Sequence, residues 1–355
     1  MLEKIIVKGK EVKLPIFCPD ATRGVVRSLS SQDLNNAQVK GVIVNTWHLH
    51  QKPGEIKLAQ LGGIKKLMNY NELVISDSGG FQVFSLFQKK SDFGKITDEG
   101  LITYTGKNKQ KRLLFTPENS IQMQFAIGSD IMICLDDFTP PEADEKRQIE
   151  SVERTLAWAK RCKNEFLKKC QENKLSEKNR PWLFGVIQGH RNLELRRYCA
   201  RELLKIGFDG FGLGGWLFDE NGKLDLSICA ANAKLTPDDL PRYALGFGKP
   251  DEISQLSRQG YTIFDCVLPT RDARHGRFYI SDAVSEKGYQ FLHINKGKYE
   301  MDNLPIDPNC DCQTCQNHSR AYLHHLFKIG DSAFYRLATI HNLRFYTHWC
   351  EQEQK

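Results

Sequence analysis

The last part of the chain carries a dense group of metal-binding side chains. Cys310, Cys312 and Cys315 lie so close in sequence that their thiols can turn toward one point. Zn²⁺ prefers four sulfur or nitrogen ligands in a tetrahedral arrangement. The spacing predicts one structural zinc per chain, with three unrelated cysteines as the alternative. It leaves the fourth ligand open among the nearby histidines His318, His324, His325, His341 and His348.

An aspartate followed by glycines marks a candidate catalytic loop upstream. Asp77 begins the segment Asp-Ser-Gly-Gly-Phe-Gln. Because glycine has no side chain, Gly79 and Gly80 would let the backbone approach a ligand closely. Ser78 lies beside them, and Phe81 could stack on a planar ligand. The alternative interpretation makes Asp77 only the capping residue of a tight turn.

A second aspartate lies beside a group of cations. Asp265 is followed by Arg271 and Arg274, which could hold phosphate groups. Paired carboxylates are the usual apparatus at an anomeric carbon, where one attacks the sugar and the other moves protons on the leaving group. Asp77 and Asp265 would therefore suit a nucleoside whose base is displaced. The alternative for Asp265 is a buried salt bridge with Arg271.

Composition excludes several classes of protein. The chain has 355 residues, 40% of them hydrophobic and 26% charged, and its net charge of +7 leans mildly toward a polyanionic partner. No apolar run approaches the length of about eighteen residues that a membrane helix needs. The 11 cysteines lack the spacing of a small disulfide framework. We expect a cytoplasmic protein with no membrane partner.

The chain repeats a short apolar run that ends in a polar residue or a glycine. Runs that are apolar throughout are typical of strands buried on both faces of a parallel sheet. With helix-patterned segments at 120–127, 145–170 and 192–206 between some of them, they predict a (β/α)8 barrel. An open doubly wound sheet is the alternative, but no Gly-x-Gly-x-x-Gly turn follows the first run. The eight runs cover residues 14–20, 41–46, 72–77, 130–137, 182–189, 207–215, 242–248 and 262–270.

Polar residues at the ends of these runs would gather at one mouth of the barrel, where such folds place their active sites. Carboxylates, an amide and glycines with free backbone groups could bind a planar heterocycle along its edges. We see no phosphate-binding loop and no Ser-His-Asp order among them. The strand-end residues are Asp77, Asp136, Asp137, Gln188, Gly214, Gly215, Gly246 and Asp265.

Several of these segments together resemble one enzyme family, the tRNA-guanine transglycosylases, and in particular the bacterial-type single-chain members. The matching segments follow the family order over nearly the whole chain. They are Asn45-Thr-Trp-His-Leu49, Asp77-Ser-Gly-Gly-Phe-Gln82, Thr116-Pro-Glu-Asn-Ser120, Gly185-Val-Ile-Gln-Gly189, Gly212-Leu-Gly-Gly215, Phe264-Asp-Cys-Val-Leu-Pro-Thr-Arg271, the cysteine cluster, Ser319-Arg-Ala-Tyr-Leu-His-His325 and Thr339-Ile-His-Asn-Leu343.

The resemblance implies a (β/α)8 TIM barrel with a zinc-binding subdomain inserted near its C-terminal end. It implies His341 as the fourth zinc ligand. We expect the barrel body to cover residues 1–282. The zinc-binding subdomain and a closing C-terminal helix would then cover residues 283–355.

The resemblance also implies a reaction, the exchange of the wobble guanine of tRNAs with GUN anticodons for a 7-deazaguanine during queuosine biosynthesis. Asp265 would attack C1′ and leave a covalent ribosyl-aspartate intermediate. Asp77 would act as general acid and base. The base would be bound by Asp77, Ser78, Gly79, Gly80, Phe81, Asp136, Gln188, the N–H of Gly215 and Leu245.

Partners follow from the same resemblance. The anticodon loop of tRNA would lie on two segments, and Glu220 would support the glycine-containing loop. Zinc is the expected cofactor, with no organic cofactor, and we expect a homodimer. The expected tRNA-binding residues are Gly246, Phe247, Gly248, Lys249, Thr270, Arg271, Asp272, Ala273 and Arg274.

The chain departs from the family pattern around the base. Phe138 and Trp216 replace smaller residues, and Asp272 replaces an asparagine. The larger side chains favour the aminomethyl base, preQ1, over queuine. The first strand ends in Pro-Asp20-Ala-Thr22 instead of the usual small turn. Alternative functions are a queuine-using salvage enzyme, a DNA-acting paralogue and a non-catalytic RNA-binding partner subunit, although the last would be free to lose Asp77 and Asp265.

Overall fold

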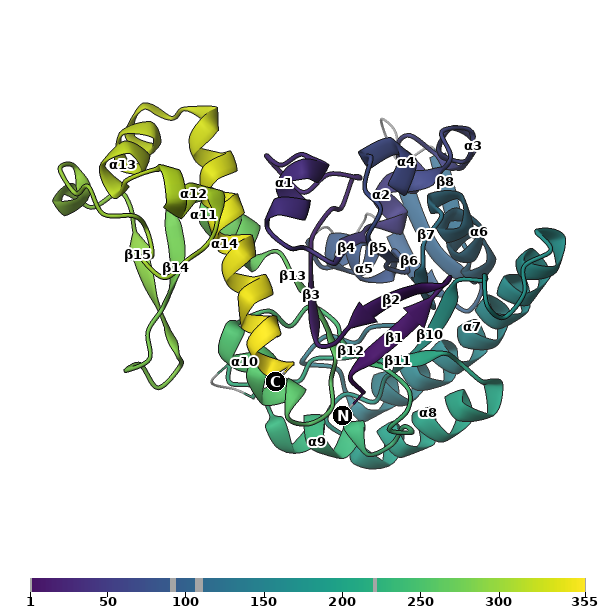
Figure 1. The fold of residues 1–355 in the computed structure, drawn as a ribbon. Coiled ribbons are helices and arrows are strands. Elements are labelled where there is room, and N and C mark those ends of the chain that lie inside the picture. Colours follow the sequence, from purple (N-terminus) through teal and green to yellow (C-terminus); the bar gives the residue numbers. More distant parts are fainter. Residues whose placement is uncertain (1, 90–93, 106–110, 220–221, 355) are drawn as a thin grey trace.

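The computed structural model describes residues 2–89, 94–105, 111–219 and 222–354. Its centre is a parallel sheet (Figure 1). The sheet has 8 strands in the order β3-β13-β12-β11-β10-β9-β5-β4. A parallel bridge from Asp20 to Ile43 joins the two end strands. The sheet is therefore a nearly closed barrel. Its strands are β3 (Ile16–Pro19), β4 (Gly41–Val44), β5 (Leu73–Ser76), β9 (Ile131–Ile133), β10 (Trp182–Ile187), β11 (Gly210–Leu213), β12 (Arg242–Ala244) and β13 (Ile263–Cys266).

Each strand lies within one of the eight apolar runs, and helices follow the strands along the chain. The predicted barrel is thus confirmed, and the open sheet is excluded. The helices around the barrel are α1 (Ser31–Asn36), α2 (Thr46–Gln51), α3 (Glu55–Gln60), α4 (Gly63–Met68), α5 (Gly80–Lys89), α6 (Pro117–Ile127), α7 (Glu145–Glu172), α8 (Leu193–Ile206), α9 (Leu226–Ala233), α10 (Pro250–Ser257) and α11 (Leu268–Arg274).

Two small antiparallel sheets are added to the barrel. One is the N-terminal hairpin of β1 (Lys4–Val7) and β2 (Lys10–Lys13). The other is a 3-stranded sheet inserted between α5 and α6, and the apolar runs did not predict it. Its strands are β6 (Gly94–Thr97), β7 (Gly100–Thr105) and β8 (Lys111–Phe115).

The tail forms a unit at one side of the barrel, from which one long helix returns (Figure 1). The predicted domain boundary at residue 282 falls between the two strands of its hairpin. Tyr346 on the returning helix packs its ring 4.6 Å from that of Phe17 in β3. The elements of the tail are β14 (Arg277–Ser281), β15 (Tyr289–His293), η3 (Gly297–Tyr299), α12 (Gln313–Asn317), α13 (Arg320–Ile329) and the returning helix α14 (Ser332–Glu353).

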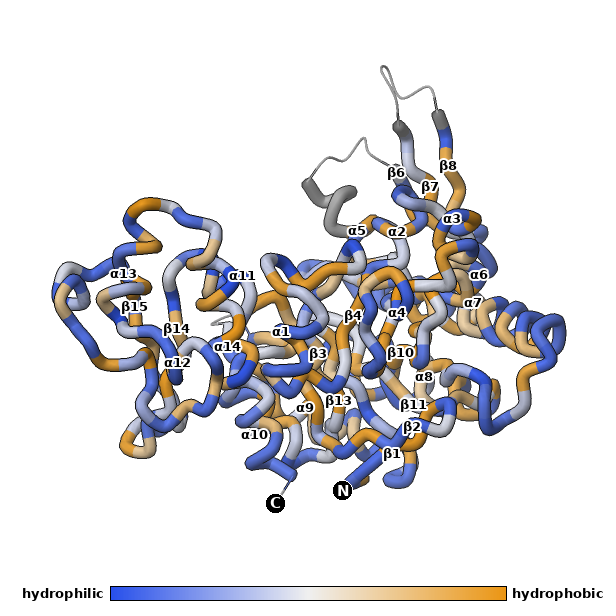
Figure 2. Tube along the Cα trace, turned by 45° about the horizontal axis from the view of Figure 1, so that its top comes forward, coloured by the Kyte–Doolittle hydropathy of each residue, from blue (hydrophilic) through white to orange (hydrophobic). Residues whose placement is uncertain are grey.

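The apolar residues lie where the fold buries them. In Figure 2 the barrel strands β3 and β13 are largely hydrophobic, whereas the outer end of α7 is hydrophilic. Every residue of β3, β4 and β5 is buried, as expected for strands covered on both faces. Among the described residues, no helix is long and apolar enough to cross a membrane.

Candidate active site

Asp77 lies directly after β5 at the carboxyl end of the barrel, and three donors hold its side chain. Oδ2 accepts a hydrogen bond from Nδ2 of Asn45 at 2.6 Å. Oδ1 accepts from the backbone N–H of Thr46 at 2.9 Å and of Gly79 at 3.0 Å. Burial nevertheless raises the pKa of Asp77 to about 7, since loss of water disfavours the charge more than these donors favour it, and the nearby Asp265 adds to the rise. Asp77 can therefore give and take a proton near neutral pH.

Asp265 belongs to β13 and shares the same mouth. The N–H of Gly246 donates to its Oδ1 at 2.9 Å. Burial raises the pKa of Asp265 to about 6, which still leaves a carboxylate at neutral pH. No ion pair joins it to a described cation; Arg271 instead lies 3.9 Å from Asp272. The alternative of a buried salt bridge with Arg271 is therefore not what the structure shows.

Asp136 and Gln188 meet at the ends of neighbouring strands. Nε2 of Gln188 donates to Oδ2 of Asp136 at 2.6 Å. Oε1 of Gln188 is buried without a hydrogen-bond partner among the described residues. Burial also raises the pKa of Asp136 to about 6. Buried polar atoms are normally paired, so this oxygen and this carboxylate mark a place where a polar ligand would fit.

The glycine loop after β11 comes close to the same amide. A Cβ on Gly214 would lie 2.7 Å from Nε2 of Gln188, and a Cβ on Gly215 would lie 3.3 Å from Oε1. Gly215 also has φ +89°, which favours glycine. Across the loop, a Cβ on Gly212 would lie 2.9 Å from the partly buried Leu245. Side chains at Gly214 and Gly215 would thus fill the space beside Gln188.

Aromatic side chains follow both Asp77 and Gly215 closely along the chain. The Phe81 ring is exposed and lies 5.2 Å from Phe138, which also packs 5.0 Å from Phe84. On the glycine loop, Trp216 is 40% exposed, and its ring lies 5.3 Å from that of Phe218. Phe138 thus packs against the predicted stacking residue Phe81, and Trp216 packs against Phe218 of its own loop.

The predicted tRNA-binding residues separate into exposed and buried side chains. Lys249 and Arg271 are exposed, Gly246 is exposed, and Arg274 is partly exposed. The remaining residues, Phe247, Gly248, Thr270, Asp272 and Ala273, are buried. Asp272 accepts a hydrogen bond from the hydroxyl of Tyr279 at 2.7 Å, so it points into the protein. Glu220 lies outside the described residues.

Two buried charged residues beside the site differ from the sequence analysis, which placed Asp137 among the polar residues of the barrel mouth and did not single out Arg196. Asp137 is fully buried between two arginines, with Oδ1 2.5 Å from Arg147 and Oδ2 2.6 Å from Arg154. It therefore holds the loop after β9 in place and does not face a ligand. Arg196, on α8, hydrogen-bonds Gly214 at 2.8 Å. Only the spacing of α7 offered a signal, since Arg147 and Arg154 lie seven residues apart on one helix face.

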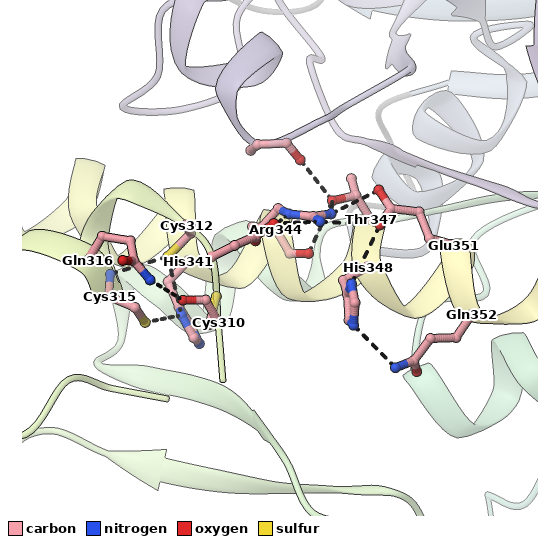
Figure 3. Close-up of polar contacts among 12 residues, drawn as sticks. Cys310, Cys312, Cys315, Gln316, His341, Arg344, Thr347, His348, Glu351 and Gln352 are labelled. Atoms are coloured by element: carbon pink, nitrogen blue, oxygen red, sulfur yellow. Dashed lines mark hydrogen bonds and ion pairs between the residues drawn. The ribbon is translucent and has the colours of Figure 1, made fainter. Parts of the chain in front are cut away.

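A second centre lies in the tail, where α14 meets the cysteine segment (Figure 3). The ligand atoms of Cys310, Cys312, Cys315 and His341 all lie within 4.8 Å of one another. Nε2 of His341 contacts the carbonyl of Tyr279 at 2.7 Å, which places the ring proton there and leaves Nδ1 free to face the thiols. Nδ1 lies 3.1 Å from Sγ of Cys315.

Three sulfurs and one nitrogen at this separation form a donor set that can hold a metal ion. Hydrogen bonds from Cys310 and Cys315 lower the pKa of the Cys312 thiol. Two of the other candidate histidines are engaged elsewhere. His324 contacts the carbonyl of Ile294, and His318 stacks on Tyr322.

Helix α14 connects the metal cluster to the barrel mouth. The Tyr346 hydroxyl donates to the carbonyl of Gly248 at 2.7 Å, and Nδ2 of Asn342 donates to the carbonyl of Pro269 at 3.0 Å. Gly248 ends the turn whose first residue, Gly246, binds Asp265. The helix that carries His341 therefore also holds two backbone segments near Asp265: the turn after β12 and the start of α11.

A (β/α)8 barrel with carboxylates of raised pKa at the carboxyl ends of its strands has the architecture of an enzyme. A sequence model of the family "Queuine tRNA-ribosyltransferase" matches residues 2–354. The chain belongs to this family, as its resemblance to the tRNA-guanine transglycosylases predicted, and it is therefore an enzyme of the pentosyltransferase class.

Individual relatives agree with the family match. The queuine tRNA-ribosyltransferase of Psychrobacter sp. (strain PRwf-1) is 38% identical over 342 residues, which cover 96% of this chain and 85% of the relative. That of Acinetobacter baumannii (strain ACICU) is 38% identical over 335 residues, 94% of this chain and 84% of the relative. That of Mannheimia succiniciproducens is 37% identical over 341 residues, 96% of this chain and 85% of the relative.

Proposed function

We propose that the protein exchanges the wobble guanine of tRNAs with GUN anticodons for a 7-deazaguanine through a covalent ribosyl-aspartate. The observation that carries this proposal is the pair of carboxylates at one mouth, Asp265 with a pKa of about 6 and Asp77 with a pKa of about 7. One is ionised at neutral pH and can attack, and the other can hold a proton for the leaving base.

The two carboxylates divide the work of the exchange. An oxygen of Asp265 forms a bond to C1′, the bond from C1′ to N9 of guanine breaks with its electron pair going to the base, and Asp77 protonates that base. The incoming 7-deazaguanine then gives its N9 proton to Asp77 and attacks C1′, which releases the Asp265 carboxylate. The ester conserves the reactivity of the glycosidic bond, so the exchange needs no organic cofactor.

Base recognition in this proposal falls to the groups around Gln188. The Asp136 carboxylate and the unpaired Oε1 of Gln188 accept hydrogen bonds from the N–H groups of a guanine edge, and the N–H of Gly215 donates to its carbonyl. Phe81 and Leu245 cover the two faces of the ring. Ser78, Gly79 and Gly80 shape the wall next to Asp77.

We further propose that the aminomethyl base preQ1 is the preferred incoming substrate. Trp216 follows Gly215 directly, so its indole lies beside the part of the base nearest the bound carbonyl. A cyclopentenediol needs more room there than an aminomethyl group. Queuine use is the alternative if the exposed indole swings away from the loop or stacks on the ligand.

The tRNA contacts of the proposal rest on exposed cations. Lys249 follows the turn whose Gly246 binds Asp265, and Arg271 and Arg274 belong to α11, directly after β13; all three would bind phosphates of the anticodon loop. The metal in the Cys310, Cys312, Cys315 and His341 cluster would be zinc, since its donor set is the one that structural zinc takes. We also propose a homodimer, which sedimentation of the purified protein would test.

Incubation with radiolabelled guanine and unmodified tRNA tests the function. We expect label to enter tRNA that has a wobble guanine and to be displaced by preQ1. Label in a DNA hairpin of the same sequence, and not in tRNA, would favour the DNA-acting alternative. Binding of tRNA without any exchange would favour a non-catalytic subunit.

A further inference from the structure

Arg196 is a fully buried arginine whose hydrogen bonds to the described residues all go to uncharged acceptors. Its Nε donates to the carbonyl of His190 at 2.6 Å, and Nη1 donates to the carbonyl of Ile187 at 3.2 Å. Nη1 also donates to Oδ1 of Asn232 at 3.1 Å, and Nη2 to the carbonyl of Gly214 at 2.8 Å. One guanidinium thus ties the turn after β10 to the glycine loop after β11.

The positive charge of Arg196 is not neutralised within the described structure. No salt bridge joins it to a described carboxylate, although a buried charge is normally paired. Burial lowers the pKa of Arg196 to about 10, which still leaves the guanidinium charged at neutral pH. Fold stability alone gives little reason to keep such a charge, because a neutral side chain of similar volume would avoid the loss of hydration.

The cation contacts the same peptide group that is expected to bind the base. Gly214 supplies the carbonyl of that peptide and Gly215 supplies its N–H, which forms no hydrogen bond to another described residue. A Cβ on Gly215 would lie 3.2 Å from Nη2 of Arg196 and 3.3 Å from Oε1 of Gln188. A cation that donates to the carbonyl oxygen of a peptide group polarises the N–H of the same group, and it resists rotation of the peptide plane.

We propose that Arg196 is a positioning residue that aims and polarises the N–H of Gly215 toward the carbonyl of the base. This inference rests on the proposed function, because that reaction places negative charge on the base when the bond to C1′ breaks. Much of the charge resides on the carbonyl oxygen. A donor strengthened by a fixed buried cation favours this charged state more than the neutral base.

Base affinity measured without tRNA tests the inference apart from turnover. Guanine carries the carbonyl, whereas the fluorescent base 2-aminopurine lacks it. We expect Arg196→Met to weaken guanine binding about tenfold and 2-aminopurine binding less than about twofold. Arg197→Met is the matched control, since Arg197 is the next residue of α8 but is exposed and pairs with Glu194.

A second variant separates charge from structure and guards against loss of folding in Arg196→Met. Asn232→Asp keeps an oxygen acceptor for Nη1 but gives the guanidinium a counter-charge. A purely structural role predicts unchanged base selectivity. Our inference predicts a weaker preference for guanine over 2-aminopurine in a stable protein, and partial recovery of that preference in Arg196→Lys relative to Arg196→Met.

The outcomes distinguish this inference from the proposed function. Suppose that wild-type protein exchanges guanine, but that Asn232→Asp and folded Arg196→Met keep the wild-type ratio of the two base affinities. The role of Arg196 is then refuted, and the proposed function stands. If wild-type protein exchanges no guanine into any tRNA, the proposed function fails, and with it the premise of this inference.

Discussion

The side-chain amide of Gln188 donates through Nε2 to Oδ2 of Asp136 at 2.6 Å, across the ends of β10 and β9. This contact fixes the orientation of the amide, so its Oε1 is the atom left free and buried. A ligand that donates to Oε1 removes an unsatisfied atom, whereas one that presents an acceptor there adds a repulsion. The pair therefore requires the bound base to place a hydrogen-bond donor opposite Oε1 of Gln188.

Gln188→Met removes the acceptor Oε1 and nearly keeps the volume of the side chain. We expect KM for guanine to rise about 5- to 150-fold, which corresponds to about 1–3 kcal/mol for one lost buried partner. Steady-state exchange with tRNA at saturation measures it. Gln259→Met is the control, since Gln259 bonds to Leu226 at 3.2 Å away from the barrel mouth. A KM within twofold of wild type would show that Gln188 does not contact the base.

The pH dependence of kcat/KM should be bell-shaped and narrow. Asp265 must be ionised to attack, so activity falls as the pH drops below about 6. Asp77 must be protonated to release guanine, so activity falls as the pH rises above about 7. Because the two groups interact, the two apparent pKa values belong to the pair. A rate that is constant from about pH 5 to pH 9 would contradict these roles.

Loss of the metal should disturb the catalytic turn indirectly. Cys312→Ser combined with His341→Ala removes two of the four donors in the cluster. Since metal affinity and local folding are coupled, we expect less than about one metal ion per chain and faster proteolysis in the tail. Activity should fall because α14 also holds Gly248. Elemental analysis and limited proteolysis provide the measurements. Full metal content in the double variant would place the metal elsewhere.

Trp216 should limit the size of the base substituent. We expect Trp216→Leu to improve use of queuine relative to preQ1, since leucine is smaller beside Gly215. Competition of the two bases for one tRNA measures the ratio. Its ring already leans on Phe218, so Phe218→Leu is a second variant that frees the indole to move. Equal or better use of queuine by wild-type protein would show that our steric argument is wrong.

The barrel could be predicted from the sequence because strands buried on both faces leave unbroken apolar runs. The sheet inserted between α5 and α6 could not, since one of its strands, β6, has no fully buried residue. Strand ends also located Asp77, Asp136, Gln188 and Asp265, because a parallel barrel brings them to one mouth.

Contacts between side chains that are distant along the chain could not be predicted, because they produce no periodic pattern in the sequence. The bond from Arg196 to Asn232 joins residues 36 positions apart, and neither residue belongs to a motif that the sequence reveals. The orientation of Asp272 was equally hidden, because its partner Tyr279 lies on the next strand of the tail. Local periodicity predicts which face of an element is buried but not which buried polar groups meet.

Trapping of a covalent protein–RNA adduct tests the central claim most directly. Wild-type protein mixed with unmodified tRNA and no incoming base should give an adduct that survives denaturing electrophoresis. Asp265→Asn should bind the tRNA but give no adduct, and the control Asp239→Asn, which changes an exposed carboxylate, should match wild type. An adduct of unchanged yield in Asp265→Asn would contradict the assignment of Asp265 as the nucleophile.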